Sequence, residues 1–242
     1  MTEQLYRADA YLRDCTAQVL AVNERGGIVL DRTVFYAAAG GQPGDKGTLE
    51  TEGGGSCTIA TTVYDADKTT IVHVPAEGGT PPAPGQSVRA SLDWGFRSPI
   101  MRMHTTLHLL CALVKFPVTG GQVNPDDSRL DFDIDDPSAV DKDRLTADLN
   151  ALIAADHPVS ERWITDAELE ANPGLVRTMS VKPPMGTGRV RLVLIGESGA
   201  VDVQPCGGTH VERTGEIGRV AVTRIEKKGK LNRRIRVSFV QE

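Results

Sequence analysis

The sequence predicts an α+β protein in which a small β-barrel-like domain is followed by a mixed α+β domain. Three observations lead to this fold class. Up to residue 92 the chain carries short β-prone runs separated by turn residues, which is typical of a small barrel or sandwich. A long apolar run at 97–116 then has the pattern of one helix. Beyond it, strand-like and helix-like runs follow each other without an internal repeat.

The β-rich part is expected to end shortly before this helix. Its Gly- and Pro-rich segment 78–85 looks like a linker, but 86–92 alternates apolar and polar residues as a strand does. We therefore expect 78–85 to be a hairpin loop inside the first domain, and we expect domains at 1–95 and 96–242. The expected strands of the first domain are 16–22, 27–35, 47–51, 57–64, 69–74 and 86–92.

The second domain should open with the helix 97–116, which has apolar residues on most sides and is expected to be largely buried. Pro117 should end it, because proline lacks the backbone N–H that a helix needs. A short helix should begin near Thr165, since Thr165 and Glu168 have the spacing of a capping box. The other expected elements are a strand within 126–136, a helix at 138–155, and strands at 158–164, 190–195, 218–226 and 233–240.

Composition excludes several classes of protein. The chain has 242 residues, of which 40% are hydrophobic and 24% charged, as in globular proteins. Its net charge of −5 argues against a dedicated DNA-binding protein, so any nucleic-acid contact must be local. No run approaches the roughly 18 apolar residues of a membrane span, and the first residues lack the pattern of a secretory signal. Together with only four cysteines, this predicts a cytoplasmic location.

Two short motifs carry metal-ligating residues. In HTTLH, His104 and His108 are four residues apart, so on a helix their Cβ atoms lie about 5–6 Å apart on one face. In CGGTH, Cys206 and His210 are also four residues apart, and the two glycines between them permit a tight backbone turn. One thiolate and three imidazoles are ligands typical of Zn²⁺. The motifs together predict one zinc site.

Each motif alone has a structural alternative. A histidine pair on an apolar helix is often part of a core, and a single CxxxH spacing is a weak signal. Thr105 occupies the position at which HExxH metalloproteases carry their general base, which argues against that protease chemistry. Four protein ligands also close a tetrahedral shell, as in structural zinc sites. Catalysis would require one ligand to leave or the shell to expand.

The motifs HTTLHLL and CGGTHVERTGEIG resemble those of the editing domain of alanyl-tRNA synthetase and of its free-standing relatives, the AlaX proteins. The resemblance extends over nearly the whole chain in the family's order. In length and in having the glycine-motif domain, the chain is similar to the medium form. Ala37–Ala39 and the residues Thr106 and Leu107 of HTTLH depart from frequent family residues, which bears on pocket shape and thus on amino-acid selectivity. The other matching segments are 35–47, 92–97, 128–133 and 225–236.

This resemblance implies a fold and an activity. It implies the editing domain common to threonyl- and alanyl-tRNA synthetases, with Zn²⁺ bound by the four predicted ligands. It also implies a hydrolase that cleaves the aminoacyl ester of mischarged tRNA-Ala in trans, with Ser-tRNA-Ala or Gly-tRNA-Ala as substrate. The partner would be tRNA, with no DNA, membrane or obligatory protein partner.

Several further residues are implied to contact the substrate. Gln122 and Thr119 are the implied catalytic residues: Gln122 falls where the family has a polar residue near the pocket, and Thr119 is a candidate for recognising the serine hydroxyl. Both are alternatively loop residues that cap the preceding helix. Gly40 and Gly41 would let the backbone approach the tRNA 3′ end, or else form a tight hairpin. Gln42 completes a GGQ tripeptide that also occurs in translation release factors.

A local excess of basic residues near the end of the chain predicts a phosphate-binding surface, since Arg and Lys side chains neutralise nucleic-acid phosphates. The alternative is a solvated hairpin. The acidic stretch 126–136 is expected to face away from RNA. The basic residues assigned to tRNA are Lys227, Lys228, Lys230, Arg233 and Arg234.

Two other functions remain open on the sequence. A closed Cys-His₃ shell is compatible with a non-catalytic tRNA-binding module that contains a structural zinc. A zinc hydrolase acting on a small ester or amide is the other alternative. Dependence of the rate on tRNA separates this hydrolase from a deacylase.

Overall fold

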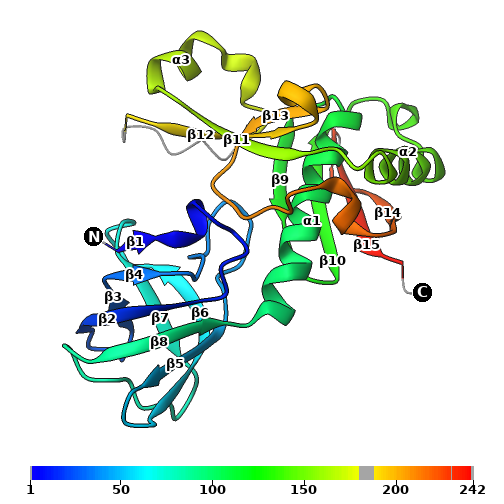
Figure 1. The fold of residues 1–242 in the computed structure, drawn as a ribbon. Coiled ribbons are helices and arrows are strands. Elements are labelled where there is room, and N and C mark those ends of the chain that lie inside the picture. Colours follow the sequence, from blue (N-terminus) through cyan, green and yellow to red (C-terminus); the bar gives the residue numbers. More distant parts are fainter. Residues whose placement is uncertain (1, 180–187, 230, 241–242) are drawn as a thin grey trace. The chain divides into compact units, whose positions relative to one another are not determined.

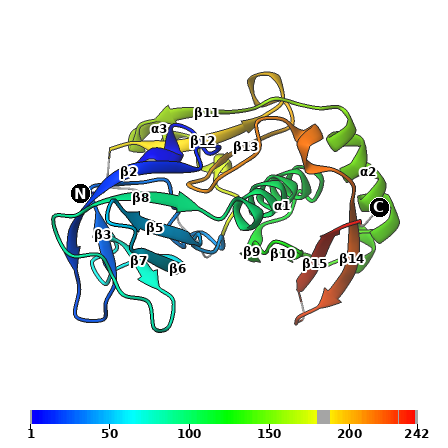
Figure 2. The ribbon, with the colours of Figure 1, turned by 60° about the horizontal axis from the view of Figure 1, so that its bottom comes forward.

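The fold is taken from a computed structural model, and residues 2–179, 188–229 and 231–240 are described (Figures 1 and 2). The chain divides into two compact units, Met1–Pro99 and Ile100–Glu242. The expected boundary after Gly95 lies inside helix α1 (Trp94–Leu113). Helices and strands both occur, as the α+β fold class requires. Among the described residues no helix is both long and apolar enough to span a membrane.

Unit 1 contains a closed six-stranded barrel, which confirms the expected barrel-like domain. The strand order around it is β2-β3-β7-β6-β5-β8, and all pairings are antiparallel. Outside the barrel, β1 (Glu3–Gln4) pairs in parallel with β4 (Arg32–Thr33), and a short 3-10 turn spans Leu5–Arg7. The barrel strands are β2 (Asp14–Val22), β3 (Ile28–Leu30), β5 (Gly47–Thr51), β6 (Ser56–Tyr64), β7 (Ile71–Pro75) and β8 (Ser87–Leu92).

One expected connection is wrong. Segment 78–85 lies in unit 1 between β7 and β8, but these strands are not neighbours, because β8 pairs with β2 and β5. The segment is therefore a crossover connection rather than a hairpin loop. The alternation in β8 did predict its faces: Val88, Ala90 and Leu92 are buried in the barrel core.

The start of α1 is anchored inside unit 1. Asp93 accepts a hydrogen bond from the Phe96 amide, which caps the helix. Arg97, fully buried, donates to both carboxylate oxygens of Asp45 and to the carbonyl oxygens of Ala10 and Val34. This buried ion pair satisfies the guanidinium within the barrel unit.

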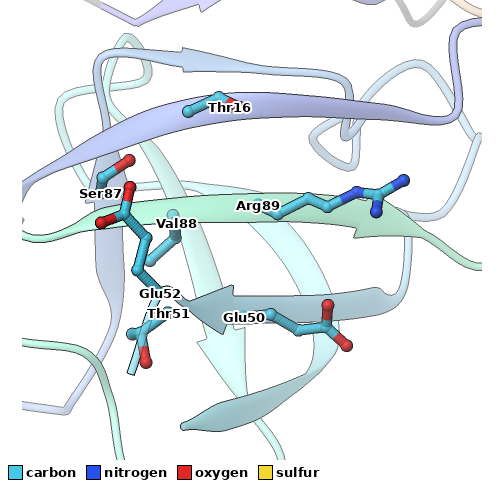
Figure 3. Close-up of a pocket in the computed structure, with 7 residues that line it drawn as sticks. All are labelled: Thr16, Glu50, Thr51, Glu52, Ser87, Val88 and Arg89. Atoms are coloured by element: carbon cyan, nitrogen blue, oxygen red, sulfur yellow. The ribbon is translucent and has the colours of Figure 1, made fainter. Parts of the chain in front are cut away.

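A pocket lies on strands β2, β5 and β8 of the barrel (Figure 3). Its charged lining residues are Glu50, Glu52 and Arg89, and Arg89 also pairs with Asp14. We assign no function to this pocket. The remaining lining residues are Thr16, Thr51, Ser87 and Val88.

In the described residues of unit 2, two sheets combine with α1 and two further helices. A four-stranded sheet has the order β14-β15-β10-β9, and a three-stranded sheet has the order β11-β12-β13. Both views show α1 beside β9 and β10 (Figures 1 and 2). The strands are β9 (Val118–Gln122), β10 (Asp127–Asp133), β11 (Val159–Ile164), β12 (Val190–Ile195), β13 (Asp202–Pro205), β14 (Val220–Lys227) and β15 (Asn232–Phe239). The helices are α2 (Lys142–Ala154) and α3 (Asp166–Ala171), with 3-10 turns at Pro137–Ala139, Pro173–Leu175, Glu197–Gly199 and Thr214–Ile217.

The apolar pattern of α1 predicted its burial correctly. Ile100, Met103 and Leu109 are completely buried, so the helix forms part of the core of unit 2. The helix ends at Leu113, a few residues before the expected end at Phe116. The expected capping box is present at Thr165 and Glu168.

Candidate metal centre and basic sheet face

The two predicted metal motifs meet in unit 2. Helix α1 carries His104 and His108, and the loop after β13 carries Cys206 and His210. One ligand atom from each of the four residues lies within 4.8 Å of all the others. Cys206 Sγ is 3.6 Å from His104 Nε2 and 3.3 Å from His210 Nε2. The four side chains form a cluster that could bind a metal ion.

The CGGTH loop is held by its own backbone and by β12. The Gly208 amide donates to Cys206 Sγ at 3.4 Å. Arg191 on β12 donates to the carbonyl oxygens of Cys206 and Gly208, at 3.2 and 2.8 Å. A Cβ added to Gly207 would meet no atom within 4 Å, so the space around this glycine is open. The thiol is thereby directed at the histidines.

The donor set fits a metal cation. Zinc-type bonds of about 2.3 Å to sulfur and 2.0–2.1 Å to nitrogen, at tetrahedral angles, imply about 3.6 Å between sulfur and nitrogen. The separations of 3.6 and 3.3 Å from the Cys206 sulfur to His104 and His210 are close to this value. All three imidazoles are buried, so a cation bound there would exchange its water ligands for protein ligands.

The local charges favour the ligating form of the thiol. Burial opposes ionisation of Cys206, but the neighbouring His104 and His210 lower its pKa well below the usual range. Burial likewise lowers the pKa of His210 to about 3, keeping that imidazole neutral. For Cys206 and His210, a thiolate and a neutral imidazole are the protonation states that metal ligands need. Burial lowers the pKa of His108, but its hydrogen bonds to Asp202 and Cys206 outweigh burial and raise this pKa to about 10, so His108 must lose a proton when a metal binds.

Two contacts around the cluster had no signal in the sequence. Asp202 Oδ2 lies 2.9 Å from His108 Nδ1, and Thr105 Oγ1 lies 3.2 Å from His210 Nδ1. In both pairs the partners are about a hundred residues apart in the chain. Nothing in the local sequence around Asp202 predicts that it reaches α1.

Gln122 and Thr119 lie on β9, the edge strand of the four-stranded sheet. Gln122 is exposed, and its Nε2 is 3.4 Å from Asn124 Oδ1. Thr119 Oγ1 donates to the Asp131 carbonyl oxygen and accepts from Asn232 Nδ2. The alternative, that they are loop residues, is wrong, because they belong to a strand. Their catalytic roles stay predictions.

The glycine motif forms a two-residue hairpin. Gly40 and Gly41 have φ values of 57° and 84°, and Ala39 and Gln42 exchange backbone hydrogen bonds across them. Positive φ at both central residues is the geometry that glycine provides in such turns. Gln42 is buried, with 2% of its surface exposed, whereas both glycines are exposed. Contact of this hairpin with tRNA stays a prediction.

The predicted basic residues divide between the faces of the four-stranded sheet. Lys227 and Lys228 are exposed at the end of β14 and just beyond it, and Arg234 lies on β15 on the polar face. Arg233 is buried, with 5% exposure, and its Nη1 donates to the Asn232 carbonyl oxygen. Lys230 lies outside the described residues.

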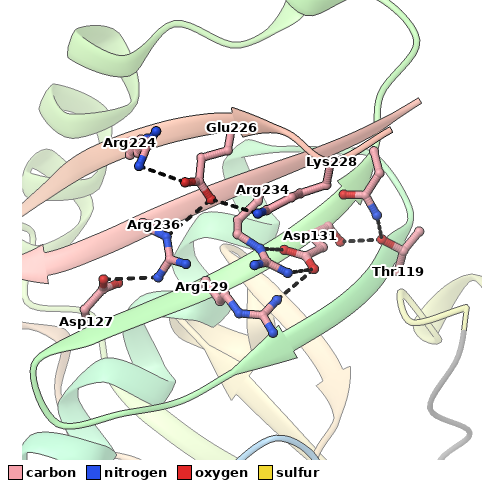
Figure 4. Close-up of polar contacts among 10 residues, drawn as sticks. Thr119, Asp127, Arg129, Asp131, Arg224, Glu226, Lys228, Arg234 and Arg236 are labelled. Carbon is pink, nitrogen blue, oxygen red and sulfur yellow. Dashed lines mark hydrogen bonds and ion pairs between the residues drawn. The ribbon is translucent and has the colours of Figure 1, made fainter. Parts of the chain in front are cut away.

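The acidic stretch lies beside the basic residues in the same sheet, and its expected orientation away from RNA stays a prediction. Strand β10, which carries the acids, pairs directly with β15. Asp131 accepts from Arg234 at 2.7 and 2.8 Å and from Arg129 at 2.7 Å (Figure 4). Asp127 lies 3.2 Å from Arg236. The register of the sheet, which the sequence did not show, alternates the two signs of charge.

On the face of the four-stranded sheet drawn in Figure 4, cations outnumber carboxylates. One carboxylate, Glu226, lies within 4 Å of three cations: Arg224 at 3.1 Å, Arg236 at 3.4 Å and Lys228 at 3.8 Å. We call the ten residues drawn in Figure 4 the basic sheet face. It contains five cations and three carboxylates, and they are Thr119, Asp127, Arg129, Asp131, Arg224, Glu226, Lys228, Asn232, Arg234 and Arg236.

Two family models match parts of the chain. The model described as the threonyl and alanyl tRNA synthetase second additional domain matches residues 190–236. The model described as tRNA synthetases class II (A) matches residues 10–96. The first match covers the CGGTH loop and most of the basic strands, and the second covers the barrel.

Curated proteins match the chain over nearly its full length. An alanyl-tRNA editing protein AlaX-M from Methanosarcina acetivorans is 34% identical over 97% of this chain and 98% of its own. The AlaX-M protein of Methanosarcina mazei is 32% identical over 100% of this chain and 98% of its own. The alanine--tRNA ligase of Pyrobaculum arsenaticum is 34% identical over 93% of this chain but only 25% of its own length. With relatives of this identity along their whole length, the chain belongs to the AlaX-M family of alanyl-tRNA editing proteins.

Proposed function

We propose that this protein is a trans-editing hydrolase that cleaves the aminoacyl ester of mischarged tRNA-Ala. Ser-tRNA-Ala is the main proposed substrate and Gly-tRNA-Ala a second one. The observation that carries the proposal is the cluster of His104, His108, Cys206 and His210, within 4.8 Å of one another, in a chain of the alanyl-tRNA editing family. The cytoplasm, where tRNA is charged, is its proposed location.

An editing site is needed in addition to the amino-acid pocket of the synthetase that charges tRNA-Ala. That pocket holds the methyl group of alanine, and it discriminates against a slightly different side chain by only about 1–3 kcal/mol, or about 10–200-fold. Glycine is smaller and serine only adds a hydroxyl, so both reach the tRNA. A site that recognises the hydroxyl can hydrolyse the serine ester and leave the alanine ester intact.

We propose Zn²⁺ as the metal, because one thiolate and three imidazoles in a tetrahedral arrangement are ligands that zinc prefers. Zn²⁺ bound there would supply a Lewis acid that positions the substrate or polarises a water. The chain's own contribution is to hold the ligands. In this proposal Gln122 and Thr119 orient the substrate, and Thr119 reads the serine hydroxyl.

Among the described residues, the ligand cluster consists of one cysteine and three histidines and contains no carboxylate that could act as a base. Thr105 stands where metalloproteases have Glu, and Asp202 is bound to His108 and to Gln204. The terminal hydroxyl of the tRNA is therefore proposed to assist proton transfer. This separates the proposed chemistry from that of HExxH proteases.

The five cations of the basic sheet face are the proposed contacts for tRNA phosphates. Carboxylates hold its guanidinium groups in place, so little side-chain entropy is lost when they bind an anion. Lys227 is proposed as an additional contact at the end of β14. Gly40 and Gly41, which are exposed at the tip of the hairpin in unit 1, are proposed to contact the tRNA as well, while the buried Gln42 holds the hairpin through its backbone hydrogen bonds to Ala39.

A closed four-ligand shell favours a second candidate function, a non-catalytic tRNA-binding module with a structural zinc.

The test of the proposed deacylase is the rate of ester loss from Ser-tRNA-Ala with the wild-type protein and with Cys206→Ala. The proposal predicts rapid ester loss that falls by at least about 100-fold in the variant, because the metal loses its thiolate. Cys57→Ala, which changes a thiol in the barrel core, is the control and should keep the rate.

Binding of tRNA without ester loss by zinc-loaded wild-type protein would instead favour the binding module. Cleavage of small esters at a rate that tRNA does not affect would favour a small-molecule hydrolase.

A further inference from the structure

Two hydrogen bonds around the metal cluster decide which ring nitrogen each histidine offers to a metal. His210 Nδ1 lies 3.2 Å from Thr105 Oγ1, and His108 Nδ1 lies 2.9 Å from Asp202 Oδ2. The positions of the hydrogens follow from the other partners of these oxygens.

The Thr105 hydroxyl has only one hydrogen, and it donates this hydrogen to a carbonyl oxygen in a hydrogen bond. Thr105 Oγ1 donates to the Met101 carbonyl oxygen at 2.9 Å, and this oxygen can only accept. The Val211 amide also points at Thr105 Oγ1, at 3.3 Å. Towards His210 the hydroxyl oxygen can therefore only accept, so the proton of the ring is on Nδ1. Nε2, 3.3 Å from Cys206 Sγ, is left as the ligand atom.

The same logic applies to His108. The Asp202 carboxylate is buried and accepts two contacts from Gln204 Nε2, at 3.0 and 2.9 Å. A carboxylate accepts from imidazole Nδ1–H, so this proton stays on Nδ1 and Nε2 is again the atom that faces the cluster.

We propose that Thr105 and Asp202 are positioning residues that fix His210 and His108 as Nε2 ligands of the metal. The inference rests on the metal site of the proposed function. It also gives Thr105 a role at the position where HExxH proteases carry their base: it orients a ligand instead of moving a proton.

The chain contains a matched control in the next residue. Thr106 is on the same helix and is completely buried like Thr105, and its Oγ1 donates to the Arg102 carbonyl oxygen at 2.8 Å. Valine has nearly the shape of threonine but no hydroxyl. Thr105→Val and Thr106→Val thus remove the same kind of helix hydrogen bond, and only the first removes the acceptor for His210.

The test is zinc affinity, measured by competition with a chelator on the purified full chain. Thr105→Val and Asp202→Asn are expected to bind zinc about 10–100-fold more weakly than the wild type. Thr106→Val is expected to stay within about twofold of it. Thr105→Ser retains the hydroxyl and should restore most of the affinity.

A second readout follows the proton itself. In the ¹⁵N-histidine NMR spectrum of the zinc-loaded wild type, Nδ1–H signals of His210 and His108 should be visible and slow to exchange with solvent. Thr105→Val should speed the exchange at His210 alone, and Thr106→Val should leave it unchanged.

The inference is overturned if Thr105→Val and Thr106→Val have equal affinities, or if Thr105→Ser loses as much affinity as Thr105→Val. A wild type that binds no zinc overturns both this inference and the proposed zinc site. A protein that shows the expected affinities but leaves Ser-tRNA-Ala intact contradicts only the proposed deacylase activity.

Discussion

His73 shows how a single buried residue can determine the response of the barrel to pH. Its Nδ1 donates to the Ile28 carbonyl oxygen at 3.1 Å, and its Nε2 lies 2.8 Å from Thr33 Oγ1. Burial lowers the pKa of His73 to about 4. In the neutral ring, Nε2 accepts a hydrogen bond from the Thr33 hydroxyl. A second proton on Nε2 would break this hydrogen bond, so the folded barrel favours the neutral ring.

This predicts that the barrel loses stability in acid. The unfolded chain protonates His73 near pH 6.5, whereas the folded chain resists protonation until about pH 4. The contribution is therefore complete above pH 6.5 and is lost as the pH falls towards 4, by about 2–3 kcal/mol between pH 7 and pH 4.5. Urea unfolding followed by Trp94 fluorescence in a Trp163→Phe background measures it. His73→Gln should flatten the pH dependence, and an equally steep curve in that variant would contradict the assignment.

At the residue scale, the sequence predicted the candidate ligands but not the residues that orient them. His104 and His108 show a helical spacing, and Cys206 and His210 share a glycine-rich turn, so each pair is a local signal. Asp202 and Thr105 act on histidines about a hundred residues away. Such contacts depend on how β13 and the CGGTH loop pack against α1, which no local pattern contains.

The first turn of α1 depends on one buried ion pair. Arg97 and Asp45 have side chains that are 0% and 2% exposed, and Asp45 Oδ2 also accepts from the Tyr36 amide at 2.6 Å. Removing one partner would leave a charge buried without compensation. Arg97→Met should therefore lower the free energy of unfolding of the barrel by about 3–5 kcal/mol.

The comparison is an exposed pair of the same barrel. Arg89 and Asp14 lie 3.4 Å apart with side chains 62% and 47% exposed, so Arg89→Met should change the stability by less than about 1 kcal/mol. Denaturant unfolding of both variants checks the difference. Equal effects would show that the Arg97–Asp45 pair does not anchor α1.

The strands β14 and β15 carry the prediction for tRNA binding. Replacing Arg234 by Gln on the basic sheet face should weaken tRNA binding about three- to tenfold. The slope of the logarithm of the affinity against the logarithm of the salt concentration should become smaller by about one, because one phosphate contact is lost. The control is Arg144→Gln on α2, where the side chain is 83% exposed and pairs only weakly, at 3.6 Å, with Asp148. Filter binding of tRNA at several salt concentrations separates the two. If both variants bind tRNA equally well, the basic sheet face is not the interface.

At the element scale, alternation and helical periodicity predicted most strands and helices. Gly47–Thr51 and Val190–Ile195 match the expected ranges. Strand β9 was missed because Gly120 and Gly121 are poor strand formers, and it forms as an edge strand on β10. Segment 78–85 was misassigned because turn composition does not show which strands a connection joins.

For the whole molecule, the barrel was predictable as a class but its strand order was not. Six short strands with turn signals favour a barrel, yet the pairing of β8 with β2 and β5 comes from closure of the sheet. Likewise, the local basic excess was visible in the sequence, while its alternation with Asp127 and Asp131 depends on the register of β10 and β15. The family was recognisable because the ligand motifs are compact in sequence.

The central claim is that the protein removes the wrong amino acid from tRNA-Ala and leaves the right one. The most direct measurement compares the loss of serine from Ser-tRNA-Ala with the loss of alanine from Ala-tRNA-Ala, using the same zinc-loaded protein. The account predicts that the serine ester is hydrolysed at least about 100-fold faster, because only serine offers a hydroxyl to the site. Equal rates for both esters, or no hydrolysis of either by folded, zinc-loaded protein, would contradict it.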